Sequence, residues 1–203
     1  MPRRCTDHTS PAAELRPTST GSNLLGVTDI EIPRPTDGDV VDLILADHRL
    51  FEDLLHFVRD KTKDRAAGRQ ALADVVVAHA IAEELHVYPT LERKGAVDDE
   101  DIEHGKHEHL EGNERLLDLL AVTDVQSEDF DEAVENVTKA LAHHLDEEER
   151  EILNPARTDV EDSVKRDLGK KFAAERNRQL DSGPVDTERL RRLIDKERAE
   201  TGS

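Results

Sequence analysis

Apolar and polar positions follow a helical period along four stretches of the chain. Within residues 39–155, apolar side chains recur at intervals of three and four, which places them on one face of an α-helix. The expected helices cover about residues 39–61, 66–92, 98–121 and 127–153. Their connections, such as KTKDR and RKGAV, are short and indicate antiparallel neighbours. We therefore predict an all-α fold, an up-down-up-down four-helix bundle at residues 39–155.

The two flanks of the predicted bundle have a different composition. Residues 1–38 are rich in Pro, Ser and Thr and lack a helical period, so we expect a disordered leader. Residues 156–203 are charged, and from residue 163 onward they carry eleven Lys or Arg against eight Asp or Glu. Stretches such as LRRLIDKE predict a C-terminal tail that is partly helical and either docks on the bundle or stays free.

Composition and charge narrow the class of protein. Aromatic residues make up only 2% of the 203 residues, which argues against a β-sandwich or barrel. A net charge of −19 argues against nucleic acid as a partner, because phosphate binding needs a positive field. No apolar run approaches a membrane span, and no hydrophobic core of a signal peptide follows the N-terminal arginines. The single cysteine, Cys5, favours a reducing compartment, so we expect a cytoplasmic protein.

One histidine lies on the inward stripe of each predicted helix. These four are His48, His79, His109 and His144. The midpoint between each consecutive pair falls in or beside the connection between their helices, so all four reach roughly one level of the bundle. His79 and His144 are each followed four residues later by a glutamate, Glu83 and Glu148, on the same helix face.

Nitrogen and oxygen side chains at one level of an apolar core indicate a metal site. Buried carboxylates are costly unless they are paired or bound to a metal, and the inward stripes offer only one strong cation, Lys106. Ligands of this kind suit iron, with manganese or zinc as alternatives. Two carboxylates that bridge two metals, with imidazoles at the outer positions, would use all six side chains.

Three stretches resemble the hemerythrin, or HHE cation-binding, domain: DVVDLILADHRLFEDLLHFV, HAIAEELHVYP and HHLDEEEREILNP. The order His, HxxxE, His, HxxxE carries the resemblance, which covers about residues 39–155. It implies a non-haem centre of two iron ions joined by an oxo or hydroxo bridge. The ligands it implies, with the two glutamates as bridges, are His48, His79, Glu83, His109, His144 and Glu148.

The third predicted helix departs from the pattern of oxygen-carrying hemerythrins. Those proteins are expected to place two histidines four residues apart there, whereas His104, His107 and His109 contain no such pair. One or more metal positions would stay open, which suits O₂, NO or peroxide. We expect a protein that binds or senses such a small ligand. The alternatives are a di-iron enzyme for peroxide breakdown or iron–sulfur repair, and a metal-free adaptor bundle that recruits a protein partner.

We expect the polar neighbours of the six predicted ligands to have roles other than metal binding. Three acidic neighbours are expected to face solvent: Asp47, Glu84 and Glu149. Tyr88 stands five residues after Glu83, off the metal face of a regular α-helix, so we expect it to pack rather than bind. The sequence leaves open whether His86 or His104 joins the site.

Overall fold

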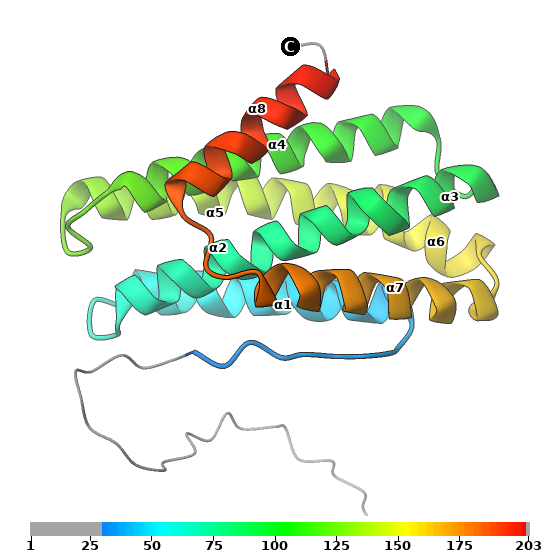
Figure 1. Ribbon diagram of the computed structural model, residues 1–203, viewed down its shortest axis with the longest axis horizontal. Coiled ribbons are helices and arrows are strands. Elements are labelled where there is room, and N and C mark those ends of the chain that lie inside the picture. The colour runs from blue at the N-terminus through cyan, green and yellow to red at the C-terminus, as the bar shows by residue number, and fades with distance from the viewer. Residues whose placement is uncertain (1–29, 202–203) are drawn as a thin grey trace, which may run out of the picture.

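The computed structural model describes residues 30–201, and every regular element in that range is helical (Figure 1). The four long helices that carry the predicted stripes are α1 (Val40–Arg59), α2 (Arg65–Ala82), α4 (Asp99–Ala121) and α5 (Glu128–Glu148). Two π-helical segments lead into shorter helices: η1 (Glu83–Val87) into α3 (Tyr88–Lys94), and η2 (Glu149–Leu153) into α6 (Asn154–Asp159). The predicted all-α class is confirmed.

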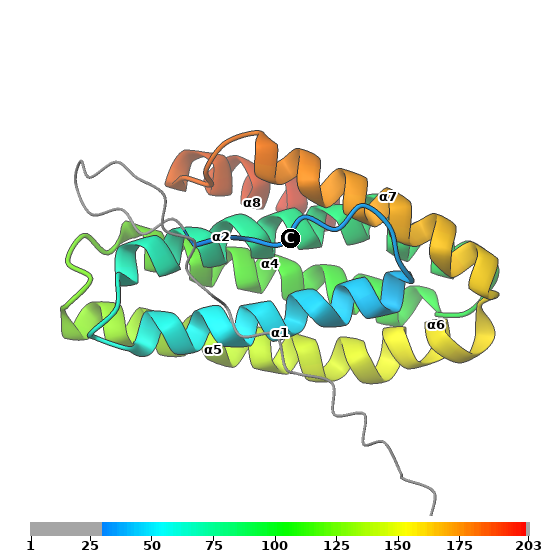
Figure 2. The ribbon, with the colours of Figure 1, turned by 90° about the horizontal axis from the view of Figure 1, so that it is seen from below.

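The four long helices enclose a common interior. α1 packs on α2 and α4 packs on α5, while α1 also contacts α5 and α2 contacts α4 (Figures 1 and 2). The core layers that they bury include Ile44, Phe51, Val76, Leu116, Val137 and Leu141. Each helix begins at a side chain that accepts a backbone N–H and so stabilises the first turn. These caps are Asp39, Asp64, Asp98 and Ser127.

The charged region after residue 155 forms helices that dock on the bundle. α7 (Asp162–Asp181) packs along α2 and α1, and α8 (Thr187–Thr201) packs on α4 (Figures 1 and 2). Apolar residues on each helix are buried, including Phe172 on α7 and Leu190 on α8. Of the two arrangements that the sequence left open, the structure shows the docked one.

Residues 30–38 lie against α7, although we expected disorder up to residue 38. Arg176 Nη1 donates a hydrogen bond to the carbonyl of Pro33 at 2.9 Å, and Asn177 Nδ2 donates to that of Pro35 at 2.7 Å. An extended, proline-containing segment leaves its carbonyls unpaired, and α7 supplies the donors. The expectation of disorder does not fit this part of the leader. The rest of it, residues 1–29, lies outside the described residues.

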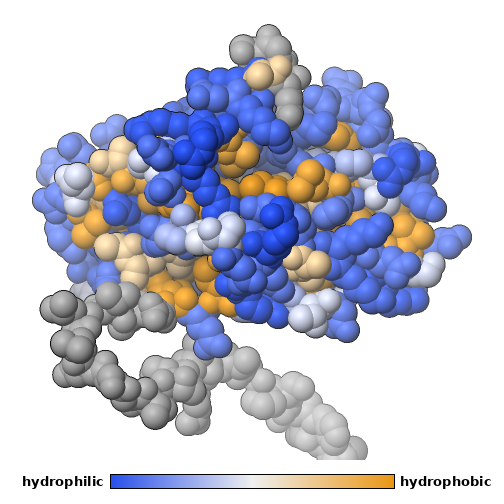
Figure 3. All heavy atoms as spheres, viewed as in Figure 1, coloured by the Kyte–Doolittle hydropathy of each residue, from blue (hydrophilic) through white to orange (hydrophobic). Residues whose placement is uncertain are grey.

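On the face shown in Figure 3, hydrophilic residues predominate and hydrophobic residues show in areas among them. Among the residues that the structure describes, Leu85 is a large hydrophobic residue that is exposed, at 53%. Within residues 30–201, no helix has both the length and the apolar character needed to cross a membrane.

A buried arginine, Arg65, ties together the end of the bundle where α1 meets α2 and α4 meets α5. Its side chain is 1% exposed and donates to Val58 O, Val125 O and Asp131 Oδ1, each at 2.6 Å. The guanidinium carbon also lies 4.5 Å from the ring centroid of Phe130. Every nitrogen of the buried cation therefore has a partner, which offsets the cost of its desolvation.

Replacing Arg65 with methionine should lower the free energy of unfolding by about 3 kcal/mol, because the carbonyls of Val58 and Val125 lose their donor and Asp131 loses one of its two cations. Urea denaturation measures the change. Arg59→Met is the matched control, since it removes only the exposed ion pair with Glu135 and should cost less than about 1 kcal/mol. Equal losses in the two variants would contradict the anchoring role of Arg65.

Candidate metal centre

The structure brings all six predicted ligands into one buried cluster. They come from four long helices and the start of η1: His48, His79, Glu83, His109, His144 and Glu148. None of the six is more than 6% exposed. These side chains lie at one level of the bundle because each is on the inward face of its helix and the connections between the helices are short.

The cluster divides into two groups, each with two imidazoles and one carboxylate. One group is His48, His79 and Glu148, and the other is Glu83, His109 and His144. Within each group the candidate ligand atoms all lie within 4.8 Å of one another. The ring centroids of the two imidazoles are 5.4 Å apart in the first group and 4.7 Å apart in the second.

Each carboxylate reaches one histidine of both groups. The distances from Oε2 to the imidazole Nε2 atoms are 3.0 and 3.4 Å for Glu83 (His79, His109), and 3.1 and 3.7 Å for Glu148 (His48, His144). A carboxylate between two imidazole pairs has the placement of a bridge between two cation positions.

Most of the inward-facing nitrogen and oxygen atoms are buried and make no hydrogen bond of good geometry, although Nε2 of His79 and of His48 lie within ion-pair distance of a glutamate oxygen. They are Nε2 of His48, His79 and His144, both carboxylate oxygens of Glu83, and Oε2 of Glu148. Such atoms destabilise a fold unless something satisfies them. Imidazole nitrogens and carboxylate oxygens that converge in a dry interior fit a divalent or trivalent transition metal.

A carboxylate holds the outward nitrogen of every histidine in the cluster. The Nδ1–oxygen pairs are His48–Glu149 (2.9 Å), His79–Asp47 (3.2 Å), His109–Glu84 (2.9 Å) and His144–Glu108 (3.2 Å). A proton donated from Nδ1 orients the ring and leaves the Nε2 lone pair directed at the cluster, as metal binding requires.

The expectation that the acidic neighbours only face solvent is wrong for Asp47 and incomplete for the other two. Asp47 is 5% exposed. The side chains of Glu84 and Glu149 are 22% and 47% exposed, so both keep some contact with water while accepting from an imidazole. A residue beside a helical ligand points away from the metal, but here it reaches the histidine of a neighbouring helix.

Asp47 is held in turn by Arg176, a fully buried arginine on α7. Arg176 Nε donates to Asp47 Oδ2 at 2.6 Å, and Nη2 donates to Oδ1 at 2.7 Å. Burial raises the pKa of Asp47, but the hydrogen bond and charge of His79 and the charge of Arg176 outweigh burial and lower it. α7 therefore fixes the orientation of His79. The sequence did contain an indication that Arg176 is buried. It follows Leu168 and Phe172 at four-residue intervals, which places all three on the buried face of α7.

Tyr88 reaches the cluster because the helix widens after Glu83. In η1 the backbone N–H of Tyr88 donates to the carbonyl of Glu83, five residues back instead of four. The buried hydroxyl donates to Glu148 Oε1 at 2.9 Å and lies 3.4 Å from His109 Nε2. The expectation that Tyr88 lies off the metal face is wrong, because it assumed a regular α-helix.

Gly105 makes room for the Tyr88 hydroxyl. A Cβ atom at Gly105 would lie only 3.1 Å from that oxygen. Position 105 is four residues before His109, where a second histidine of the spacing expected for oxygen carriers would stand. Tyrosine oxygen thus occupies space that a second α4 histidine would take. Neither His86 nor His104 belongs to the two buried groups.

A small cavity of about 10 Å³ borders the cluster between α2, α4 and α5, enough for about one water-sized molecule. Apolar Phe51, Val76 and Leu141 line it together with Asn113 and three of the histidines. Asn113 Nδ2 donates to Glu197 of α8 at 3.1 Å, and burial raises the pKa of Glu197 to about 7. α8 thus contacts the α4 side of this cavity.

Comparison with known proteins identifies one family. The model of the hemerythrin HHE cation-binding domain matches residues 39–156, more than half of the chain. No curated protein and no solved structure gives a significant match. The matched region contains all six predicted ligands but ends before α7 and Arg176.

Arg176→Met should lower the free energy of unfolding by about 3 kcal/mol, since Asp47 would stay buried without its cation. Metal affinity should fall 10–100-fold, about the effect of losing an outer partner of a histidine ligand. Denaturation and metal titration measure the two effects. Lys170→Met, which removes the exposed ion pair with Asp167 on the same helix, is the control and should leave metal affinity unchanged. Full metal affinity in Arg176→Met would refute this support of His79.

Proposed function

This chain belongs to the hemerythrin HHE cation-binding domain family, and from that premise we propose that the buried cluster holds two iron ions and binds O₂, NO or peroxide. The observation that carries the proposal is the position of Glu83 and Glu148, each between an imidazole of one group and an imidazole of the other. The proposed scaffold is an up-down-up-down bundle of α1, α2, α4 and α5, supported by connections at alternating ends (Figure 1).

The bound iron pair would supply reversible redox chemistry and an open coordination position for the small ligand. His48 and His79 would hold one ion, His109 and His144 would hold the other, and Glu83 and Glu148 lie between the two pairs of histidines. Their Nδ1 carboxylate partners raise the basicity of the ligating nitrogens. The apolar walls of the neighbouring cavity, including Phe51 and Leu141, keep bulk water from the bound ligand.

We also propose Tyr88 as a seventh ligand, at the His109–His144 side of the cluster. Its oxygen is already close to both His109 Nε2 and Glu148 Oε1. Burial first, and then the nearby carboxylates, raise the pKa of Tyr88 well above its ordinary value, so the phenol keeps its proton until a cation replaces it.

Peroxide breakdown is the second candidate function. In this alternative Tyr88 would stay a phenol instead of binding the metal, and its hydroxyl, 3.4 Å from His109 Nε2 and bonded to Glu148, would supply the proton transfer that accompanies cleavage of an O–O bond. Iron-loaded protein that binds O₂ or NO reversibly but leaves peroxide intact would support a carrier or sensor. Sustained O₂ evolution from added peroxide would support the enzyme.

Protein purified under air should contain iron at two ions per chain, measured by elemental analysis together with an optical spectrum. His79→Ala should lower the iron content, and Glu83→Gln should disturb both ions because a bridge serves two. Tyr88→Phe should keep the iron and change its charge-transfer absorption. His107→Ala, an exposed histidine on α4, is the control. Unaltered iron in both ligand variants, or protein without iron, would refute the proposal and favour the adaptor.

Metal uptake should release protons. Burial lowers the pKa of His79, but Glu83 and Asp47 more than offset it and raise the pKa to about 9. The carboxylates beside His109 likewise raise its pKa well above the ordinary value. Below pH 9 a proton therefore competes with the metal for His79, so apparent affinity should fall as pH falls. Calorimetric titrations of metal-free protein near pH 7, in two buffers of different ionisation enthalpy, should differ in heat. Identical heats would contradict this protonation state.

A further inference from the structure

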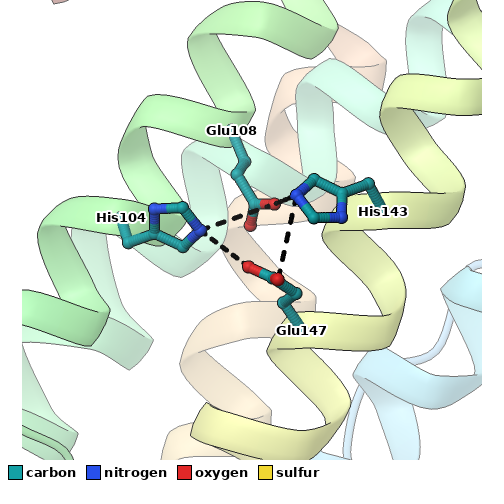
Figure 4. A group of neighbouring side chains, drawn as sticks. All are labelled: His104, Glu108, His143 and Glu147. Carbon is teal, nitrogen blue, oxygen red and sulfur yellow. Dashed lines mark hydrogen bonds and ion pairs between the residues drawn. The ribbon is translucent and has the colours of Figure 1, made fainter.

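We propose a third cation site at the surface of the bundle, outside the buried cluster, formed by His104, Glu108, His143 and Glu147 (Figure 4). α4 carries the first histidine and glutamate and α5 carries the second pair. On each helix the residues are four apart, so the imidazole and the carboxylate lie on the same face. The four side chains point toward one another across the α4–α5 contact, and their candidate ligand atoms all lie within 4.8 Å.

The distances suit a single ion. His104 Nε2 lies 2.7 Å from a Glu147 oxygen and 3.8 Å from Glu108 Oε1, and His143 Nε2 lies 3.8 and 3.7 Å from the same two residues. Four ligands held at about 2.0–2.1 Å from a tetrahedral zinc ion are separated by about 3.3 Å. The observed distances bracket that separation, so small rotations of exposed side chains would complete the site.

Glu108 provides the independent sign that a ligand belongs here. It is only 8% exposed, and its Oε1 atom, which faces the two surface histidines, is buried without a hydrogen-bond partner. Its other oxygen, Oε2, accepts from Nδ1 of His144 in the buried cluster. A surface salt bridge leaves both carboxylate oxygens free to bind water, whereas this oxygen needs a partner from within the group.

The ligand set selects a borderline divalent ion of the Fe²⁺ to Zn²⁺ series. Two imidazoles exclude a preference for Mg²⁺ or Ca²⁺, which take oxygen ligands. Two carboxylates balance the charge of one divalent ion. The side chains of His104 and His143 are 47% and 62% exposed, so the ion would exchange readily with solvent. The net charge of −19 raises the local concentration of cations.

Glu108 also connects this surface site to the buried cluster. A cation at Oε1 withdraws electron density from the carboxylate and weakens Oε2 as the acceptor for His144. A shallow depression lined by His104, Glu108 and Glu147 is also lined by Glu148, one of the two bridging carboxylates. Occupancy of the surface site should therefore change the electronic absorption of metal bound in the cluster.

Titration of the iron-loaded full chain with Zn²⁺ tests the site. Calorimetry should detect one further equivalent of Zn²⁺ without release of iron, and the iron absorption should shift during the same titration. The double variant His104→Ala/His143→Ala should keep its iron and lose both the extra equivalent and the shift. The matched control His56→Ala/His107→Ala removes two other exposed histidines and should bind Zn²⁺ as the unaltered chain does.

Two further outcomes separate this proposal from that of the buried iron pair. His79→Ala protein, whose buried cluster is impaired, should still bind the extra Zn²⁺, which keeps the surface site testable if the chain holds no iron. Equal Zn²⁺ binding by His104→Ala/His143→Ala and its control would overturn the surface site. The four side chains would then form only ordinary surface ion pairs. Zn²⁺ binding without any shift would overturn the link through Glu108.

Discussion

Two buried carboxylates that face imidazole nitrogens are the constraint on which the rest of the structure depends. Glu83 and Glu148 are almost completely removed from water, and three of their four oxygens have no hydrogen-bond partner. Burial of such groups is unfavourable unless a cation compensates it. The fold therefore concentrates its polar groups at one level and surrounds that level with apolar layers from all four long helices.

Support for the imidazoles extends outward in steps from the cluster. Each ring is oriented by a carboxylate from a different helix or turn, and one of these carboxylates, Asp47, is paired with the buried Arg176. The carbonyl of Pro33 then accepts a hydrogen bond from Nη1, the remaining nitrogen of that arginine. Orientation of a ligand near the centre of the bundle thus depends on α7 and on the extended residues that precede α1. Loss of an outer partner should alter the metal rather than only the fold.

The helices, the level of the four histidines and the burial of Glu83 and Glu148 beside them could be predicted because they depend on short-range periodicity. A stripe with a three-and-four spacing projects onto one face whatever the rest of the chain does. Tyr88 could not be placed in this way, since one extra residue in the turn at η1 rotates everything that follows. Arg176 could not be placed either, because its partner lies 129 positions away and only the docking of α7 brings them together.

Two helices beyond the matched domain contact the site. The family match ends at residue 156, yet α7 holds Asp47 and α8 contacts Asn113 at the border of the cavity. A bundle limited to residues 39–155 would lack Arg176, the cation that pairs with Asp47 behind His79. Asp47 would then lose one of the charges that lower its pKa against the effect of burial and keep it an acceptor for the Nδ1 proton of His79. The charged C-terminal helices therefore help to set the orientation of an imidazole in the buried cluster.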